Sequence, residues 1–214
     1  LASAAKEYLK VYGVLVGKKP LIFTNNDTAY ETALEFKKNG INPIILDTRE
    51  EIGSELIEEA KNQEIEIKFS YAVIAAKGYK KVKSAKVGKL NKEKNDFEKI
   101  ETIECDCICV SGFWTPSVHL ASQSGNKLKF NKDLDAFVPD KSKQSEVTIG
   151  AAKGSFTLKE SLENGFKIGA EISKKITEKD IDIQIPSVNE KKHIPHDKFW
   201  CVPLPKNEKY KRFI

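Results

Sequence analysis

Two short apolar runs that each end in small residues constrain the fold of this 214-residue chain more than any other feature. The first spans residues 105–116. The second spans residues 147–158, where the sequence passes directly into a helix-like pattern. A strand that turns through small residues into a helix brings backbone N–H groups up to a phosphate. The pair of runs therefore predicts an α/β protein with a nucleotide-type site.

The second run carries the candidate site. It reads as a strand over 147–149, a loop of small residues over 150–154 and then a long helix. Thr157 and Glu160 have the spacing of a capping box, and the free N–H groups and positive dipole end of such a helix suit an anionic diphosphate. An alternative stays open, in which the glycine and alanine residues only let the helix and the strand pack closely.

An earlier part of the chain predicts a βαβ unit, with strands over 21–24 and 44–47 and a helix between them. Asp47 ends the second strand, where a dinucleotide-binding fold uses an acidic residue to hold a ribose. The first turn, residues 25–28, contains no glycine, however, and a dinucleotide loop needs glycines so that the backbone can approach a pyrophosphate. We therefore interpret residues 18–47 as a Rossmann-like half that has lost its nucleotide loop.

The sequence on either side of this unit extends it. Residues 2–12 predict a helix that ends at Gly13. Apolar and polar side chains then alternate, which predicts antiparallel strands over 65–69, 72–76, 80–90 and 97–103. We therefore expect a three-layer βαβ-plus-meander module over 18–104.

Three cysteines, Cys105, Cys107 and Cys109, alternate along the first apolar run. Alternation along one strand would put them on one face about 6.5–7 Å apart, too far for three thiolates to bind one zinc ion without distortion. We expect small, buried side chains here, and no structural disulfide with the remote Cys201.

Other residue types that often bind metals or cofactors have simpler interpretations. His193 and His196 have no further ligand at a familiar spacing, so we expect an exposed loop rather than a metal pair. His119 lies between apolar neighbours, which favours a packed, hydrogen-bonded residue over a catalyst. Trp114 can stack on a nicotinamide or adenine ring or pack at a seam between domains, and both interpretations stay open.

Composition excludes several classes of protein. The net charge of +5 comes from lysines scattered among nearly as many carboxylates, including a basic run at 77–94, and Arg49 and Arg212 are the only arginines, so we expect no nucleic-acid partner. The longest apolar runs are far shorter than the roughly 18 residues that cross a bilayer. We therefore expect no membrane partner and a cytoplasmic location. Methionine is absent, so we expect a piece of a longer polypeptide.

Six short motifs resemble those of the α subunit of heterotetrameric sarcosine oxidase. They lie at 12–14, 23–30, 105–106, 110–120, 123–125 and 136–139. The string Ser-Gly-Phe-Trp-Thr-Pro-Ser-Val-His-Leu at 111–120 is the most specific of them. The order of elements is similar to that of a two-dinucleotide-binding-domain flavoprotein. The resemblance implies an α/β, three-layer Rossmann-like fold with an inserted NAD(P)-type βαβ-plus-meander module.

The resemblance also implies domain boundaries, with the chain as an internal fragment. Residues 1–17 would be a helix of the FAD/NAD-type domain, 18–104 the inserted module, 105–176 the return to the FAD/NAD-type domain, and 177–214 a linker toward a following domain. The fragment would belong to an oxidoreductase of one-carbon metabolism, and would carry no catalytic residues of its own.

The cofactors of such a flavoprotein complex would lie mostly elsewhere. The family oxidises sarcosine to glycine at an FAD in another subunit, passes electrons to FMN and oxygen, and passes the one-carbon unit to tetrahydrofolate. This segment would hold part of a non-catalytic NAD site, because Gly150-Ala151 stands where FAD-type domains carry the Gly-Asp that grips a flavin. The contacts would fall on Gly150, Ala151, Phe156 and Leu158, with Ala152 and Gly154 lining the loop.

The implied partners are the other subunits and the rest of the same α chain. One departure is Phe113, which stands where the family commonly has a second glycine. A different function also stays open: a degenerate reductase-fold module that binds partner subunits and no nucleotide. An active NAD(P)H-dependent reductase half is disfavoured, because the sequence has no redox Cys-x-x-Cys and no glycine-rich first turn.

Overall fold

The computed structural model describes residues 1–190, 197–204 and 212–213, and it divides into two compact units. The first unit contains residues 1–113 together with the described residues after 196. The second contains the described residues from 114 to 190. None of the described helices combines the length and the apolar character needed to cross a membrane.

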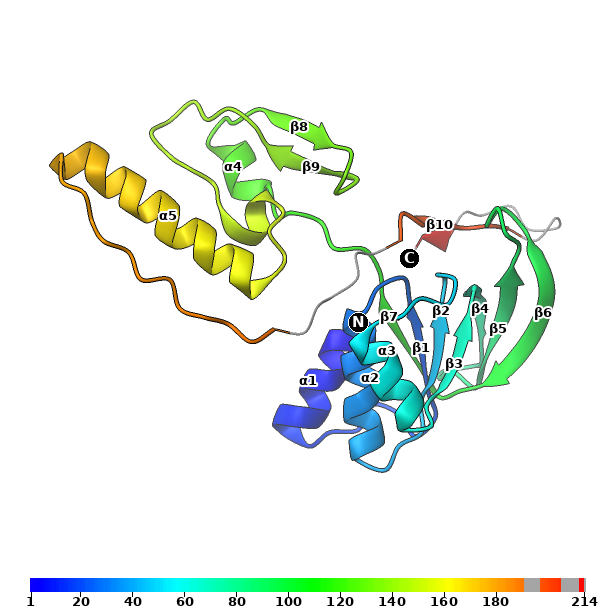
Figure 1. Ribbon diagram of the computed structural model, residues 1–214. Helices are drawn as coiled ribbons and strands as arrows, with labels where there is room; N and C mark the ends of the chain where they lie inside the picture. The colour runs from blue at the N-terminus through cyan, green and yellow to red at the C-terminus, as the bar shows by residue number, and fades with distance from the viewer. Residues whose placement is uncertain (191–196, 205–211, 214) are drawn as a thin grey trace. The chain divides into compact units, whose positions relative to one another are not determined.

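The first unit is built on a parallel four-stranded sheet with the strand order β3-β2-β1-β7. The strands are β1 (Pro20–Thr24), β2 (Ile44–Asp47), β3 (Glu66–Phe69) and β7 (Cys107–Ser111). Three helices cover one face of this sheet (Figure 1), and their apolar residues form one core with it. They are α1 (Ala2–Tyr12), α2 (Thr28–Lys38) and α3 (Glu55–Asn62). This parallel sheet with its crossover helices confirms the predicted Rossmann-like α/β class.

An antiparallel meander covers the other face of the sheet. Its strands are β4 (Tyr71–Lys77), β5 (Ser84–Leu90) and β6 (Phe97–Glu104). Side chains alternate along the central strands, so that Ile22 and Ile45 pack toward the helices while Leu21 and Leu46 pack toward the meander. Both faces of the sheet are therefore buried, which explains why β1 reads as a continuous apolar run rather than an alternating one.

The sheet gains two strands that we did not assign to it. Strand β3 pairs in parallel with β2, with Ile67 opposite Ile45, so the antiparallel strand predicted over 65–69 is wrong in its direction of pairing. Strand β7 pairs in parallel with β1, with Ile22 opposite Cys109, although we predicted that the βαβ-plus-meander module ends at 104. Helix α1, which we assigned to the other domain within 1–17, packs on α2 in the same unit, and Lys6 forms a 2.6 Å ion pair with Glu31. Local sequence patterns predicted these elements but not the elements that they contact. The assignment of these segments to FAD/NAD-type and NAD(P)-type domains stays a prediction.

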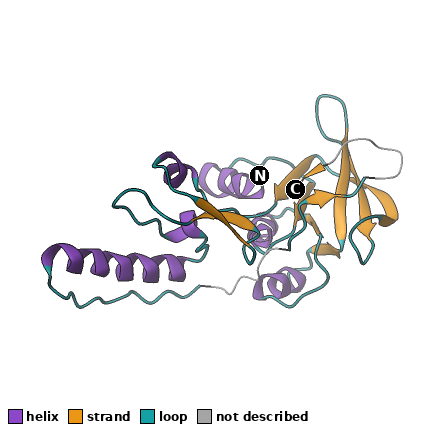
Figure 2. Ribbon diagram, turned by 90° about the horizontal axis from the view of Figure 1, so that it is seen from above, coloured by secondary structure: helices purple, strands orange, loops and turns teal. Residues whose placement is uncertain are grey.

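The second unit contains two further helices and a hairpin. Its elements are α4 (His119–Gln123), β8 (Leu128–Asn131), β9 (Ala136–Pro139), the 3₁₀ helix η1 (Gly150–Lys153) and α5 (Leu158–Thr177). The strand predicted over 147–149 is wrong, because these residues lie in a loop and pair with none of the described strands. After α5 the chain runs back beside the helix as far as residue 190 (Figures 1 and 2). No residue of α5 is buried, and its apolar side chains are partly exposed.

The described part of the C-terminal segment does not behave throughout as a linker. Phe199 and Val202 are 7% and 2% exposed and pack in the core on the meander side of the first unit. The two-residue strands β10 (Cys201–Val202) and β11 (Arg212–Phe213) pair with each other. Of the segment 177–214 that we predicted as a linker, residues 199–202 therefore contribute to a folded unit.

Because the core lies on both faces of the sheet, we expect two isoleucine-to-alanine substitutions to differ strongly in their effect on the free energy of unfolding. Ile45 is fully buried between the sheet and the helices, whereas Ile100 on β6 is 44% exposed. We expect Ile45→Ala to lower the free energy of unfolding by about 3 kcal/mol, and Ile100→Ala by less than about 1 kcal/mol. Chemical denaturation measures both variants, and equal losses would contradict the described burial.

Candidate functional site

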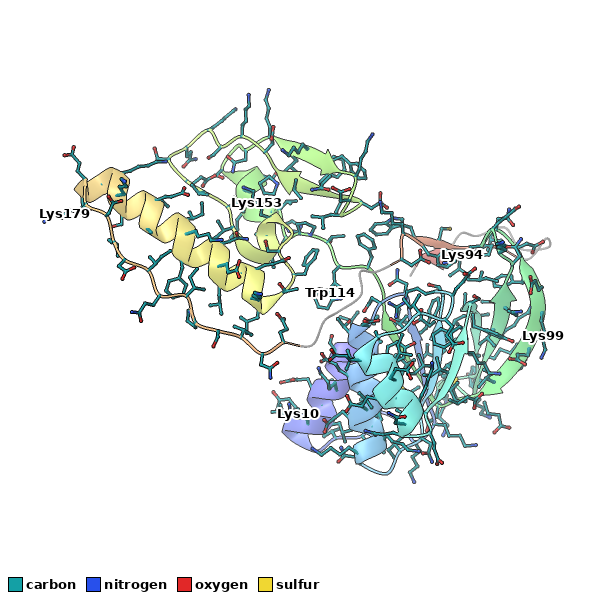
Figure 3. The ribbon with its side chains drawn as sticks, viewed as in Figure 1. Lys10, Lys94, Lys99, Trp114, Lys153 and Lys179 are labelled. Atoms are coloured by element: carbon teal, nitrogen blue, oxygen red, sulfur yellow. The ribbon has the colours of Figure 1, made fainter. Side chains whose placement is uncertain are left out.

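The six predicted site residues lie on one continuous segment of the second unit, at the N-terminal end of α5. Gly150, Ala151 and Ala152 belong to η1, and Gly154 caps its C-terminal end. Phe156 lies in the loop that follows, and Leu158 is the first residue of α5. Phe156 and Leu158 are 37% and 55% exposed, so the segment offers apolar surface beside the helix terminus. Lys153, labelled in Figure 3, ends η1 and is exposed.

Two glycines shape this segment for different reasons. Gly150 and Gly154 both have positive φ, at +66° and +101°, which side chains other than glycine rarely adopt. A Cβ atom at Gly154 would lie 2.3 Å from Cδ1 of Leu134, so close packing also requires glycine there. A Cβ atom at Gly150 would meet only the Ser161 hydroxyl, at 3.9 Å. The packing alternative therefore explains Gly154, but it does not explain Gly150 by crowding.

Internal hydrogen bonds hold the loop in shape. The N–H groups of Gly154 and Ser155 donate to the carbonyl oxygens of Ala151 and Gly150 at 3.2 and 3.1 Å. The Ser161 hydroxyl donates to the carbonyl oxygen of Ser155 at 3.2 Å and so ties the loop to α5. Part of the backbone donor capacity of the loop is therefore used within the protein.

A carboxylate lies at the N-terminus of α5. Thr157 is the N-cap, and its hydroxyl accepts from the N–H of Glu160 at 3.2 Å, which confirms this half of the predicted capping box. The N–H groups of Leu158 and Lys159 donate to the two carboxylate oxygens of Glu190 at 3.0 and 3.3 Å. An anion at this position is stabilised by the donors and by the helix dipole. The position that we predicted for a pyrophosphate thus accepts a negative charge, and in this structure the charge comes from the chain itself.

Side chains fill the first βα turn of the other unit. Asn25, Asn26 and Asp27 are all buried. The Asn26 amide donates to the carbonyl oxygens of Ser111 and Gly112 at 3.2 and 2.6 Å, joining the ends of β1 and β7. The Asn26 side-chain oxygen accepts from the N–H and hydroxyl of residue 28 at 3.0 and 2.6 Å. The turn is closed by these contacts, in agreement with the interpretation that its nucleotide loop has been lost.

A buried arginine links the segments that follow the first two strands, at the carboxyl ends of these strands. The Arg49 guanidinium contacts the carboxylates of Asp27 and Asp47 at 2.8 Å each. Tyr30 donates its hydroxyl proton to Asp47 at 2.8 Å. None of these four side chains is more than 5% exposed. Asp47, the position where a ribose would be held, is therefore engaged within the protein.

Arg49 is a structural residue to which we assigned no role from the sequence. The available signal was its rarity, because it is one of two arginines in a lysine-rich chain and follows directly after the second strand. Arginine is preferred over lysine in buried ion pairs, because its planar fork can bind two carboxylates at once. An isolated arginine at a strand end is thus a signal for a buried ion pair.

The remaining residues singled out from the sequence fall in different places. Cys105 packs on the meander side of the sheet and Cys107 and Cys109 on the helix side, so the prediction that all three share a face is wrong. All four cysteines are free in this structure. His119 is exposed, not packed, because it begins the short surface helix α4.

Two interpretations are left without a structural test. Trp114, labelled in Figure 3, is 47% exposed, and its stacking on a cofactor ring stays a prediction. His193 and His196 lie outside the described residues. Within the described residues, no group of three or more histidine, cysteine or acidic side chains is arranged to hold a metal ion.

The buried tyrosine generates a prediction about pH. Burial, and then the neighbouring Asp47, raise the pKa of Tyr30 well above its ordinary value. A phenol with a raised folded-state pKa stabilises the fold fully below about pH 10 and loses that contribution as the pH rises further. We expect the unfolding free energy of the unmodified protein to fall above about pH 10 by about 1.4 kcal/mol per pH unit more than that of Tyr30→Phe.

Denaturation at several pH values measures this difference. At neutral pH, Tyr30→Phe should cost about 1–2 kcal/mol for the lost hydrogen bond. Tyr79, which is 82% exposed, provides the control, and Tyr79→Phe should leave the alkaline slope unchanged. Parallel alkaline slopes for Tyr30→Phe and the unmodified protein would contradict the buried, protonated phenol.

The chain is similar in sequence to alpha subunits of sarcosine oxidase. It is 28% identical to the subunit of Corynebacterium sp. (strain P-1) over 172 residues, which cover 79% of this chain and 18% of the relative. It is 32% identical to the subunit of Rhizobium meliloti (strain 1021) over 154 residues, which cover 71% of this chain and 14% of the relative. The chain thus spans less than a fifth of the length of these curated relatives. No family model matches it.

Solved structures with a similar fold are flavoprotein reductases. Thioredoxin reductase of Lactococcus lactis matches with a TM-score of 0.59 at 14% identity, covering 75% of this chain and 53% of that one. A 2-naphthoyl-CoA reductase matches with a TM-score of 0.51 at 16% identity, covering 76% of this chain and 22% of that one. The sequence and fold comparisons agree with the family resemblance predicted from the motifs. We conclude that the chain is similar to a section of the sarcosine oxidase alpha subunits and has the fold of the flavoprotein reductases.

Proposed function

We propose that this chain is a section of a sarcosine oxidase-like alpha subunit and contributes part of a non-catalytic NAD site to it. The whole enzyme would demethylate sarcosine oxidatively to glycine, pass the one-carbon unit to tetrahydrofolate and pass electrons to oxygen. FAD, FMN and tetrahydrofolate would bind elsewhere in the complex, which would include further subunits. We also propose a cytoplasmic location, where free thiols such as the four cysteines persist.

The observation that carries the NAD proposal is the bidentate anion contact at the N-terminus of α5. The N–H groups of Leu158 and Lys159 donate to two oxygens of one carboxylate, and a diphosphate presents oxygens of the same charge. Gly150 has a positive φ, and the one atom near its built Cβ position is the Ser161 hydroxyl oxygen at 3.9 Å, so side chains do not crowd the loop backbone at this position. The Glu190 carboxylate must leave for a diphosphate to bind, because both would use the same donors.

The bound dinucleotide would have a structural role in this proposal. Its nicotinamide can accept a hydride, but no hydride step is assigned to this segment. The residues of the segment would bind and orient the diphosphate through backbone donors, and Phe156 and Leu158 would offer apolar surface to a ring or a ribose. Among the described residues, His119 is the only histidine, and it is exposed on the surface helix α4. The segment is therefore assigned binding and not catalysis.

A second candidate function is a reductase-fold module that binds partner subunits and no nucleotide. Three observations favour it. Side chains close the first βα turn, and Glu190 occupies the donors at the start of α5. In addition, the apolar side chains of α5 are partly exposed, with Leu158 at 55% and Ile176 at 77%. A partner that covers this helix would explain its amphipathic sequence without a cofactor.

Cofactor content separates the two candidates. The complete native polypeptide with its partner subunits would be purified, denatured and analysed by mass spectrometry for released nucleotides. Stoichiometric NAD supports the first function. A complex without NAD, with its flavins retained, supports the module that binds no nucleotide.

A charge placed in the loop tests which residues hold the diphosphate. We expect Gly150→Asp to lower the NAD content of the native protein by about tenfold, because the new carboxylate would repel the diphosphate from the same donors. Gly165→Asp controls for the charge, because it puts the same charge on α5 at an uncrowded position away from the loop, and Gly150→Asn controls for a side chain at positive φ without the charge. Glu190→Ala removes the competing carboxylate and should retain or increase the NAD content. Unchanged NAD in Gly150→Asp would overturn the assignment of this loop.

A further inference from the structure

Two cysteines on strand β7 place their sulfur atoms close together. Cys107 and Cys109 are two positions apart, so their side chains project from the same face of the strand. Their Sγ atoms are 3.7 Å apart. Cys109 is 2% exposed in the core under the helices, whereas Cys107 is only partly buried. The pair thus combines one sheltered thiol with one that solvent can reach.

The contact between the two thiols makes them chemically different. A hydrogen bond from Cys109 lowers the pKa of Cys107 to about 7, against the opposing effects of burial and of Asp106. The same hydrogen bond, together with burial, raises the pKa of Cys109 far above its ordinary value. Backbone N–H groups of Lys18 and Lys19 donate to the Asp106 carboxylate at 2.8 Å each and hold it in place. Cys107 therefore loses its proton more readily than Cys109 and is the better nucleophile of the two thiols.

The position of Cys107 and Cys109 on an outer strand of the sheet allows a small local movement of the backbone. Among the described strands, β7 lies at the edge of its sheet and pairs with β1 alone. Cα atoms two residues apart on a strand are separated by about 6.6 Å, which lies at the upper end of the range that a disulfide can span. The two sulfurs need to approach each other by less than about 2 Å to bond, and a pucker of an edge strand can supply such a movement.

We propose that Cys107 and Cys109 form a redox-active dithiol that a peroxide converts to an intrastrand disulfide. The Cys107 thiolate attacks one peroxide oxygen, the O–O bond breaks, and the second oxygen leaves as hydroxide and takes up a proton to become water. Cys107 is then a sulfenic acid. The Cys109 sulfur attacks the Cys107 sulfur, the S–O bond breaks, and the departing hydroxide takes the Cys109 proton. In total, two thiols and one hydrogen peroxide give one disulfide and two waters.

The other cysteines do not offer the same chemistry. Cys105 is also 2% exposed, but it packs in the core on the opposite side of the sheet. Cys201 lies on β10, which belongs to a different sheet. Cys105 therefore provides a matched control: it has the same residue type and the same burial, without a thiol partner among the described residues.

Peptide mass spectrometry tests the oxidation. The full-length reduced protein would be treated with hydrogen peroxide, blocked with an alkylating reagent and digested with trypsin, which yields residues 100–127 as one peptide. The Cys105→Ala variant should still lose the mass of two hydrogens from this peptide and regain them with dithiothreitol. Cys107→Ala and Cys109→Ala should not form the bond. Higher oxides of Cys107 in place of a disulfide in Cys105→Ala would overturn the proposal.

Alkylation kinetics test the role of Cys109 without an oxidant. We expect iodoacetamide at pH 7 to modify Cys107 about tenfold more slowly in Cys109→Ala than in the unmodified protein, since removing the donor returns the thiol toward an ordinary pKa. Cys105→Ala should leave the rate unchanged. Cys109→Ser serves if the alanine variant does not fold, because its hydroxyl can still donate and should preserve the fast rate while blocking the disulfide. Equal rates in Cys109→Ala and Cys105→Ala would refute the thiol pair.

Discussion

The contact of Arg49 with Asp27 and Asp47 fixes the structure at the carboxyl ends of the parallel strands, where a dinucleotide-binding fold ordinarily binds its ligand. Removing a guanidinium and two carboxylates from water is costly, and the cost is offset only when the charges meet one another and additional donors in good geometry. Tyr30 supplies such a donor to Asp47. The cluster links the turn after β1 to the end of β2 and so holds two strands and a helix start in one arrangement. Loss of Arg49 would leave two buried carboxylates without a counterion, a defect that generally costs several kcal/mol.

Because side chains fill the turn after β1, the candidate nucleotide site lies in the second unit. A glycine-rich turn exposes backbone donors, whereas here the Asn26 amide bonds to the carbonyl oxygens at the end of β7. Backbone donors directed at an anion occur instead at the start of α5, where they contact a carboxylate. The two units therefore differ. In the first unit, side-chain hydrogen bonds fill the turn after β1, whereas in the second unit the backbone N–H groups at the start of α5 bind a negatively charged group.

Features set by short stretches of sequence could be predicted, and features set by distant contacts could not. The strands around Ile22 and Ile45 and the cap at Thr157 follow from local apolar runs and a three-residue spacing. The contact of Glu190 with α5 joins residues more than thirty positions apart, and no local pattern marks it. The prediction of a strand at 147–149 was wrong because a short β-branched stretch forms a strand only when a neighbouring strand is available to pair with it. The faces of the cysteines were mistaken because the strand begins at Cys107, after Cys105.

The segment that runs back along α5 carries Glu190 to the helix terminus (Figure 1), and this tether has a thermodynamic consequence. A group attached by a short length of chain has an effective concentration on the order of millimolar at its site. A free dinucleotide at micromolar concentration would therefore compete at a disadvantage with the chain's own carboxylate. Occupancy of the terminus would respond to any partner that pulls this segment away from the helix. Binding of a ligand at the start of α5 and release of the segment that carries Glu190 are thus thermodynamically coupled.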